Sequence, residues 1–316
     1  MAVFFLLLWV TGCVALGLAV AQVGPAWLDG VGSAAVVTSM SWALGARTGD
    51  RAVVAAAVAA ALSVVVLVVD TALLRTGAAV LTAVVAGVLG VMATVPAVRL
   101  LASVREVLVA VAVGMVGAVA VLGFEPVVTV TRFEYTSIVL SFVLVLVLVH
   151  RLGAGLHGLG RRGLVVVVIG TVVLLATMAY AELLRRYGLS SIVEPAVEVV
   201  RWTRSYLGAF PRPLVVLLGV PALVWGCHMR ARRRQGWWVC AFGVAATTPV
   251  AQGLVNPAGS YLEAGLQVLY GVALGLLLGI AVVRIDLALT GPRGTGSRRA
   301  EEAAAHRPEP RRFAEL

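Results

Sequence analysis

Two short charged stretches interrupt an otherwise apolar chain, and they share the same order of residues. The first reads EPVVTVTRF over residues 125–133, and the second reads EPAVEVVRW over residues 194–202. A carboxylate at a helix N-cap accepts backbone N–H groups, and proline fits the first helical position. We therefore expect Glu125 and Glu194 to mark the starts of two helices.

The arginines of the two stretches suggest a different chemistry. Arg132 and Arg201 each lie seven residues beyond the glutamate, two helical turns along the same face. Arg201 also belongs to a group of four with Arg185, Arg186 and Arg204. Such a group can bind a phosphate or an anionic lipid headgroup. The alternative is that these residues serve as helix caps and as anchors at a membrane surface.

A third polar group lies inside an apolar run. Thr247, Thr248 and Gln252 surround Pro249. Broken or kinked helices often line the substrate site of a transporter, so these three residues are candidates for substrate binding. The alternative is a plain proline kink whose freed carbonyl is satisfied by a threonine hydroxyl.

Other reactive patterns are weak. GAGLHG at residues 153–158 matches GxGxxG, but the fingerprint requires a preceding strand and a βαβ unit. The histidines show no metal-binding spacing, and the three cysteines form no CxxC. We predict no metal, no cofactor and no catalytic residue. An enzyme is therefore less favoured than a protein without catalytic activity.

The elements that position these residues follow from composition. The chain is 61% hydrophobic and 13% charged, with a mean hydropathy of +1.02. A soluble domain has roughly 25% charged residues. Apolar runs near the length of a membrane-spanning helix recur without strand-like alternation, so we predict an all-α, polytopic membrane helix bundle. About ten transmembrane helices are expected, over residues 2–23, 31–46, 52–69, 78–98, 107–123, 131–150, 163–181, 213–229, 237–254 and 264–283.

The basic residues predict the orientation of these spans. All 25 basic residues are arginines. If the N-terminus is cytoplasmic, eighteen arginines fall on cytoplasmic segments and seven on the other side. Positive residues are retained inside, so this distribution predicts a cell-membrane protein with both termini in the cytoplasm. It also accounts for the net charge of +10, and nucleic acid is not an expected partner.

Two regions are expected outside the spans of the transmembrane domain, residues 1–284. Residues 192–206 resemble a helix that lies on the outer membrane surface, with aromatic and arginine anchors. Residues 285–316 are rich in Gly, Pro, Arg and Glu and predict a flexible cytoplasmic tail.

Small residues recur on one face of the last span. Gly271, Gly275 and Gly279 are spaced by four, which lets helices approach closely. This face is expected either to pack inside the bundle or to form a homodimer or a contact with another membrane protein.

Three functions remain open from the sequence. The first is a transporter or flippase of a small amphipathic or lipid-linked compound. In span count and orientation the chain resembles the drug/metabolite transporter superfamily, although it has no motif of that family. The second is a scaffold or accessory subunit of a membrane complex. The third is a lipid-active enzyme with an outward-facing site, because many-span glycosyltransferases carry an acid in the first outer loop, where Asp29 lies.

Overall fold

The chain folds into helices because long runs of Ala, Val and Leu in an apolar surrounding must satisfy their own backbone hydrogen bonds. The computed structural model describes residues 2–152, 160–187, 190–232 and 236–290, and helices are the only regular secondary structure within them. The helices are α1 (Ala2–Val20), α2 (Trp27–Arg47), α3 (Ala52–Val69), α4 (Ala72–Met92), α5 (Leu100–Leu122), α6 (Val130–Arg151), α7 (Gly160–Tyr187), α8 (Ser190–Leu207), η2 (Val215–Gly219), α9 (Val220–Arg232), α10 (Gly236–Ala241), α11 (Val244–Val255) and α12 (Tyr261–Thr290).

Seven helical segments of the described chain are long and apolar enough to cross a membrane. They are α1, α3, α4, α5, α6, the joined α10–α11 segment and α12. The other three predicted spans coincide with α2, α7 and η2–α9, which are also helical. The prediction of an all-helical bundle is confirmed for the described residues, and several of these helices are candidates to span a membrane.

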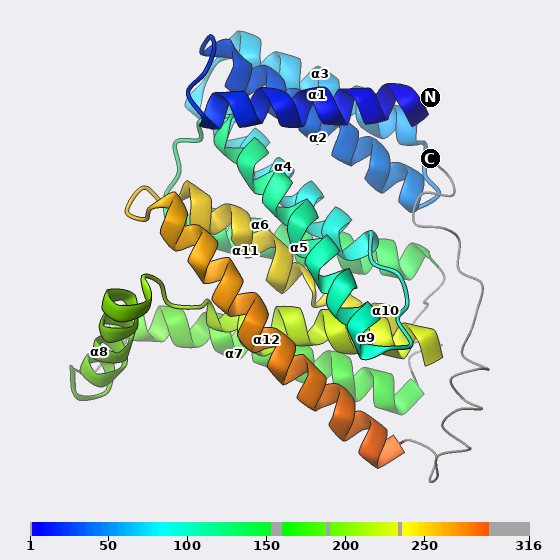
Figure 1. The fold of residues 1–316 in the computed structure, drawn as a ribbon, viewed down its shortest axis with the longest axis vertical. Helices are drawn as coiled ribbons and strands as arrows, with labels where there is room; N and C mark the ends of the chain where they lie inside the picture. Colours follow the sequence, from blue (N-terminus) through cyan, green and yellow to red (C-terminus); the bar gives the residue numbers. More distant parts are fainter. Residues whose placement is uncertain (1, 153–159, 188–189, 233–235, 291–316) are drawn as a thin grey trace.

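One end of the bundle gathers arginines. In Figure 1 the N-terminus and the last turns of α12 lie on the same side, at the right of the view. Here Arg151 at the end of α6 pairs with Asp50 between α2 and α3 (3.4 Å). Arg47, the last residue of α2, donates from Nε to the carbonyl oxygen of Met92 (2.9 Å). We call this side the arginine-rich end.

The opposite side, at the left in Figure 1, holds the starts of α2 and α12. Asp29 and Glu263 lie in the first turns of these two helices. Asp70 differs, because it ends α3, and Thr71 caps α4 by accepting the N–H of Leu74 (3.4 Å). We call this side the acidic end.

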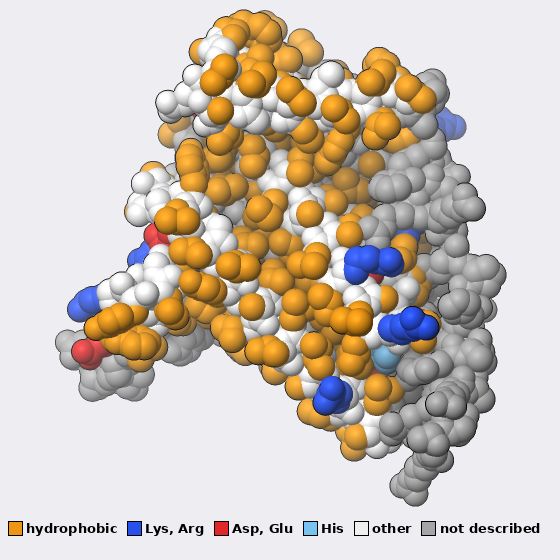
Figure 2. Space-filling view, viewed as in Figure 1, with side chains coloured by type: hydrophobic (Ala, Val, Ile, Leu, Met, Phe, Trp, Pro, Cys, Tyr) orange, Lys and Arg blue, Asp and Glu red, His pale blue; other side chains and the backbone are white. Residues whose placement is uncertain are grey.

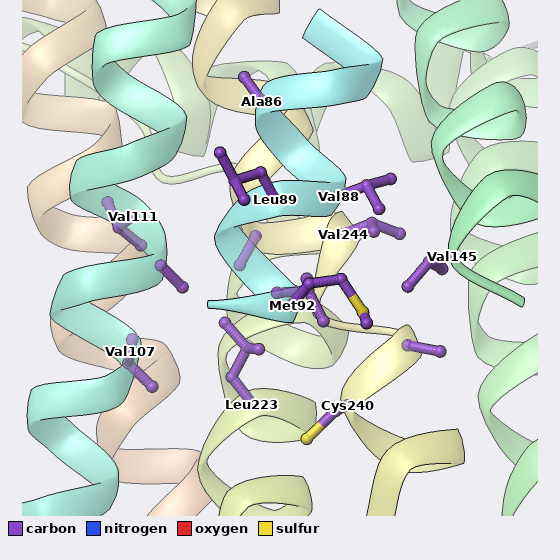
Figure 3. Close-up of a cluster of buried hydrophobic side chains, with 14 of the residues drawn as sticks. Ala86, Val88, Leu89, Met92, Val107, Val111, Val145, Leu223, Cys240 and Val244 are labelled. Atoms are coloured by element: carbon purple, nitrogen blue, oxygen red, sulfur yellow. The ribbon is translucent and has the colours of Figure 1, made fainter. Parts of the chain in front are cut away.

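The centre of the bundle is the α10–α11 segment, of which 83% is buried. It packs among α4, α5, α6 and α9. Figure 3 shows the side chains that these helices contribute: Leu89 and Met92 from α4, Val107 and Val111 from α5, Val145 from α6, Leu223 from α9 and Val244 from α11.

Among the seven candidate spans, α1 and α3 are the least buried, with 17% of each span buried. Apolar side chains cover most of the face in Figure 2, and the basic side chains gather toward the right edge and near α8. Continuous apolar surface of this extent is typical of contact with lipid rather than with water.

Two predicted boundaries differ from the structure. Helix α12 continues to Thr290, so residues 285–290 are helical and do not belong to the predicted tail. Residues 291–316 and the GxGxxG match at residues 153–158 lie outside the described residues. A helix is present where residues 192–206 predict one, and it runs from Ser190 to Leu207. Its location at a membrane surface stays a prediction.

Candidate functional site

A charged pocket lies at the acidic end, where the connections before α2, between α3 and α4, and between α5 and α6 meet. Its volume is about 280 Å³, and its lining includes Asp29, Asp70, Glu125, Arg75 and Trp27. Helix positions explain this gathering, since Asp29 and Arg75 lie in the first turns of α2 and α4, while Asp70 ends α3. Three carboxylates and one guanidinium therefore line a common space.

Arg75 ties two of these loops together. Its Nε donates to Asp70 Oδ1 (2.5 Å), and its Nη1 lies 3.0 Å from Glu125 Oε2. Both acids have a left-handed backbone, with φ of 51° and 45°, which is uncommon for residues with side chains. One arginine therefore fixes the positions of both connections.

The two Glu-Pro motifs do not begin helices, and that prediction is wrong. Glu125 lies in the connection before α6, which starts at Val130 after Thr129, and its carboxylate binds Arg75 instead of a helix N-terminus. Glu194 is the fifth residue of α8, because this helix begins one turn earlier, at Ser190. The side chain of Glu194 lies outside the described part of the chain.

An apolar groove adjoins the charged pocket. It has a volume of about 520 Å³ and is formed by α2, α3, α4 and α6. The groove and the pocket share Val66 and Phe124 as walls. Small residues create the space, because Ala55, Ala59 and Gly77 line it and leave α3 in light contact with α4.

The groove extends along most of the helix length. Its lining runs from Leu73 near the acidic end to Thr48 and Asp50 at the arginine-rich end. Helix α3 beside it has 18 residues, about 27 Å at 1.5 Å per residue, close to the thickness of a bilayer core. Besides Thr48 at the arginine-rich end, three hydroxyl residues are distributed along the wall: Ser41, Ser63 and Thr82.

The predicted substrate residues around Pro249 form hydrogen bonds between helices. Thr247 Oγ1 donates to the carbonyl oxygen of Gly87 on α4 (2.8 Å). Thr248 Oγ1 donates to Ser141 Oγ on α6 (3.0 Å). Their side chains and that of Gln252 are buried. Both threonines therefore donate to neighbouring helices. The kink hypothesis predicts instead that a threonine hydroxyl donates to the carbonyl freed by the proline.

Gln252 connects this group to an arginine that the sequence analysis did not select. Arg212, just before η2, donates from Nη1 to Glu134 Oε1 on α6 and to Gln252 Oε1 on α11, both at 3.1 Å. Its Nε donates to Gln267 Oε1 on α12 (3.3 Å). One guanidinium thus joins three helices. The α6 side of the network is a polar face whose members lie at i, i+3 and i+7: Glu134, Ser137 and Ser141.

The space beside this network is small. The cavity lined by Arg212, Gln267 and Pro249 has a volume of about 10 Å³. This is room for about one water molecule. The structure therefore brings Thr247, Thr248 and Gln252 together with charged partners, but as a packed polar contact rather than around a ligand-sized cavity.

The predicted arginines of the outer surface have different surroundings. Arg204 on α8 pairs with Glu263 on α12, with 2.8 Å between Nε and Oε1. Tyr270 on α12 donates its hydroxyl to the carbonyl oxygen of Leu207 (2.9 Å), which also holds α8 to the bundle. Arg201 is exposed on α8, and Arg132 is exposed on α6. The side chains of Arg185 and Arg186 lie outside the described part of the chain.

The glycine face of α12 is occupied inside the chain. Side chains added at Gly271, Gly275 and Gly279 would contact Val215, Val220 and Val224 of η2 and α9. These glycines therefore pack inside the bundle, which is the first of the two alternatives predicted for them.

Four further glycines bring η2–α9 and α10–α11 into close contact. A side chain at Gly219 would collide with the backbone of Ala246, and one at Gly226 would lie 2.7 Å from the backbone nitrogen of Cys240. From the other side, a side chain at Gly236 would collide with the backbone of Arg230, and one at Gly243 would collide with the side chain of Leu223. The spacing of seven within each pair is visible in the sequence.

A buried acid lies at the arginine-rich end. Glu106 is 0% exposed, and its Oε2 accepts the backbone N–H of Val95 (2.9 Å). Arg230 donates to the carbonyl oxygen of Thr94 (3.1 Å) in the same α4–α5 connection. Glu106 therefore ties this connection to α5, and Arg230 ties it to the end of α9.

The site contains no arrangement that by itself defines a reaction. Within the described residues, no group of three His, Cys, Asp or Glu side chains is placed to hold a metal ion. No protein-family model, curated protein or solved structure matches the chain. The class established here is an all-helical bundle whose apolar helices indicate an integral membrane protein.

Proposed function

We propose that this protein transports or flips a small amphipathic or lipid-linked compound, and that the compound's hydrocarbon chain lies in the groove between α3 and α4. The observation that carries the proposal is the apolar groove of about 520 Å³, which joins a charged pocket at the acidic end. An amphiphile has the same two parts, an apolar chain and a polar end.

The course of the groove supports movement along it. The lining reaches from Leu73 near one end of the bundle to Asp50 at the other. Ser41, Ser63 and Thr82 lie between these limits and offer hydroxyl groups to a polar end as it passes. The poorly buried α3 is the mobile wall in this proposal, because it packs mainly against α2 and only lightly against α4 across the groove.

We infer a topology of ten crossings in the cell membrane, with both termini in the cytoplasm. The arginine-rich end would then face the cytoplasm, in agreement with the retention of positive residues. The paired loops at each end support this orientation, since Asp50 meets Arg151 at one end and Arg75 meets Glu125 at the other. Cysteines placed singly in these loops test it by labelling with a membrane-impermeant reagent. Labelling of the Asp50 loop in intact cells would contradict it.

We also propose that α8 lies on the outer surface of the membrane. Its Trp202 and Tyr206 are exposed and packed together, with ring centres 5.1 Å apart. Amphipathic aromatic side chains favour the interface between headgroups and hydrocarbon. Arg201 would reach anionic headgroups there, while Arg204 anchors the helix to Glu263.

Two other functions keep a specific observation in their favour. A scaffold is favoured by the solid packing of α9 to α12, where the polar cavity holds about one water molecule. A lipid-active enzyme is favoured by the three carboxylates in the charged pocket, although the basic partner there is Arg75 and not the predicted Arg201. Chemical change of a lipid during the assay below would favour the enzyme.

Gly77 offers a direct test of the transport proposal. It lines the groove, and a side chain added there meets nothing within 4 Å. Gly77→Leu should therefore fill the groove without disturbing the fold. Gly17→Leu and Gly265→Leu are matched controls, because both positions are open in the same sense but do not line the groove.

The assay uses the full chain reconstituted in liposomes with a fluorescent lipid analogue, whose exposure on the outer leaflet is followed by chemical quenching. We expect movement of the analogue with the wild type and both controls, and at least a several-fold slower rate with Gly77→Leu. Equal rates in all four proteins, or in protein-free liposomes, would overturn the proposal.

A further inference from the structure

We propose that the compound held in the groove has a cationic polar end, an amine or quaternary ammonium group joined to a hydrocarbon chain. The inference rests on the proposed function, because it assigns the chemistry of the ligand at the same groove. It concerns the charged pocket at the acidic end, where the polar end of such a ligand would lie.

The apolar groove and the charged pocket are continuous. Val66 on α3 and Phe124 after α5 line both the apolar groove and the charged pocket. A chain lying in the groove at this end therefore places its terminal group among the pocket side chains. A pocket volume of about 280 Å³ accommodates a small headgroup rather than a large glycan.

The charged pocket is negative overall. Asp29, Asp70 and Glu125 contribute three negative charges, and Arg75 contributes one positive charge, which leaves a formal charge of −2. Arg75 is already engaged by two of the acids. In the described part of the chain, Asp29 has no ion-pair partner. Charge complementarity therefore favours a positive group and opposes a phosphate or a sulfate.

Aromatic side chains form part of the wall of the charged pocket. Trp27 begins α2 and Phe124 is almost fully buried, and both line the pocket. Aromatic faces attract ammonium groups, and quaternary ammonium ligands are recognised by such walls. Acids and aromatic rings thus point to the same ligand class through different physical interactions.

The experiment uses three photoreactive probes with the same alkyl chain and different ends: trimethylammonium, hydroxyl and sulfate. The full chain is reconstituted in vesicles of zwitterionic lipid, irradiated, digested and searched for labelled peptides from α3 and α4. We expect the ammonium probe to reach half-maximal labelling at a concentration about tenfold lower than the hydroxyl probe, the difference that one favourable charge contact and a cation–π contact provide.

Variants locate the effect in the pocket. Asp29→Asn should weaken labelling by the ammonium probe roughly threefold or more and leave the hydroxyl probe unchanged, since only the charge contact is lost. Glu198→Gln is the matched control, because it removes one negative charge from an exposed position of α8 that lines neither the groove nor the pocket. This control variant should leave both probes unchanged.

The outcomes separate this inference from the proposed function. Equal labelling of the groove by all three probes, or stronger labelling by the sulfate probe, would overturn the cationic assignment and leave the groove as a chain-binding site. No labelling of α3 and α4 by any probe would overturn both. An equal effect of Asp29→Asn and Glu198→Gln would show a general change of surface charge and would also overturn the assignment.

Discussion

The two sides of this bundle use a similar apolar composition in opposite ways. On one side, η2–α9 and α10–α11 approach until glycines such as Gly219 touch the backbone of the facing helix. On the other side, α3 leaves a groove of about 520 Å³ against α4, and Gly77 faces open space. A glycine is therefore a packing contact in one region and part of a cavity wall in the other.

The difference shows what each side can do. In the packed side, polar groups such as Arg212 and Gln252 bind each other across helices and leave room for about one water molecule. In the open side, the polar groups line the pocket and the groove. The packed side is suited to hold the bundle together, and the open side is suited to admit a ligand.

The largest expected effect tests the packed side. Gly219→Leu places a side chain into the backbone of Ala246, which cannot move without separating η2 from α11. Overpacking of this kind should lower the free energy of unfolding by about 3 kcal/mol or more, or prevent folding. Thermal unfolding in detergent measures it, with Gly77→Leu as the counterpart on the open side. Equal losses in the two variants would contradict the comparison.

A second effect concerns the network around Arg212. The Arg212 and Glu134 side chains are 24% and 29% exposed, so the pair is only partly screened by water. Arg212→Ala leaves a carboxylate and two amide oxygens without their donor, and should cost about 2 kcal/mol. Unfolding by denaturant in mixed micelles measures the change. Arg132→Ala, at an exposed position of α6, should cost little. Equal losses of unfolding free energy in the two variants would contradict the role of Arg212 in holding the three helices together.

A smaller effect is expected from a single hydroxyl. Thr247→Val keeps the shape of the side chain and removes the bond to the carbonyl oxygen of Gly87. Hydrogen bonds between membrane helices contribute about 0.6 kcal/mol on average, so a loss of that order is expected. The same unfolding measurement applies. Ser63→Ala is the control, because Ser63 bonds only within its own helix, to Ala59.

The smallest effect is expected at the surface. Arg204 is 49% exposed where it pairs with Glu263. Exposed ion pairs contribute about 0.2–1 kcal/mol, and salt screens them. Arg204→Ala should therefore leave the melting temperature nearly unchanged and instead raise proteolytic cleavage near α8. A melting temperature as low as that of Arg212→Ala would contradict the assignment of α8 to the periphery.

The course of the helices was predictable because hydropathy alone decides which segments can be buried in lipid. The predicted span at residues 52–69 has the same bounds as α3. The prediction that a Glu-Pro motif begins a helix was wrong at Glu125 because ion pairing with a distant residue competes with the local capping pattern. Glu125 meets Arg75, fifty residues away in sequence, and no pattern around Glu125 announces this.

The candidate site was harder to predict because its residues also contact partners that are distant in sequence. Arg212 lies between two prolines in a connection, and its partners are 40, 55 and 78 residues away. The groove was not predictable, since it arises where small residues of separate helices fall opposite each other. The polar face of Glu134, Ser137 and Ser141 was readable from its helical spacing, and it leads to Gln252 and Arg212 once the helices are placed.

The π-helix η2 gives the chain length itself a structural role. Its wider turn, with bonds from i to i+5, separates Arg212 from the regular turns of α9. Removing one residue from Val215–Gly219 would let this turn close as ordinary helix, and the segment before it would keep nearly the same direction relative to α9. Removing one residue from the regular turns of α9 would instead rotate that segment by about 100° relative to the rest of α9. Arg212 would then point away from Glu134 with no change in its own identity. The number of residues in the regular turns, and not only their types, therefore sets the direction of the guanidinium.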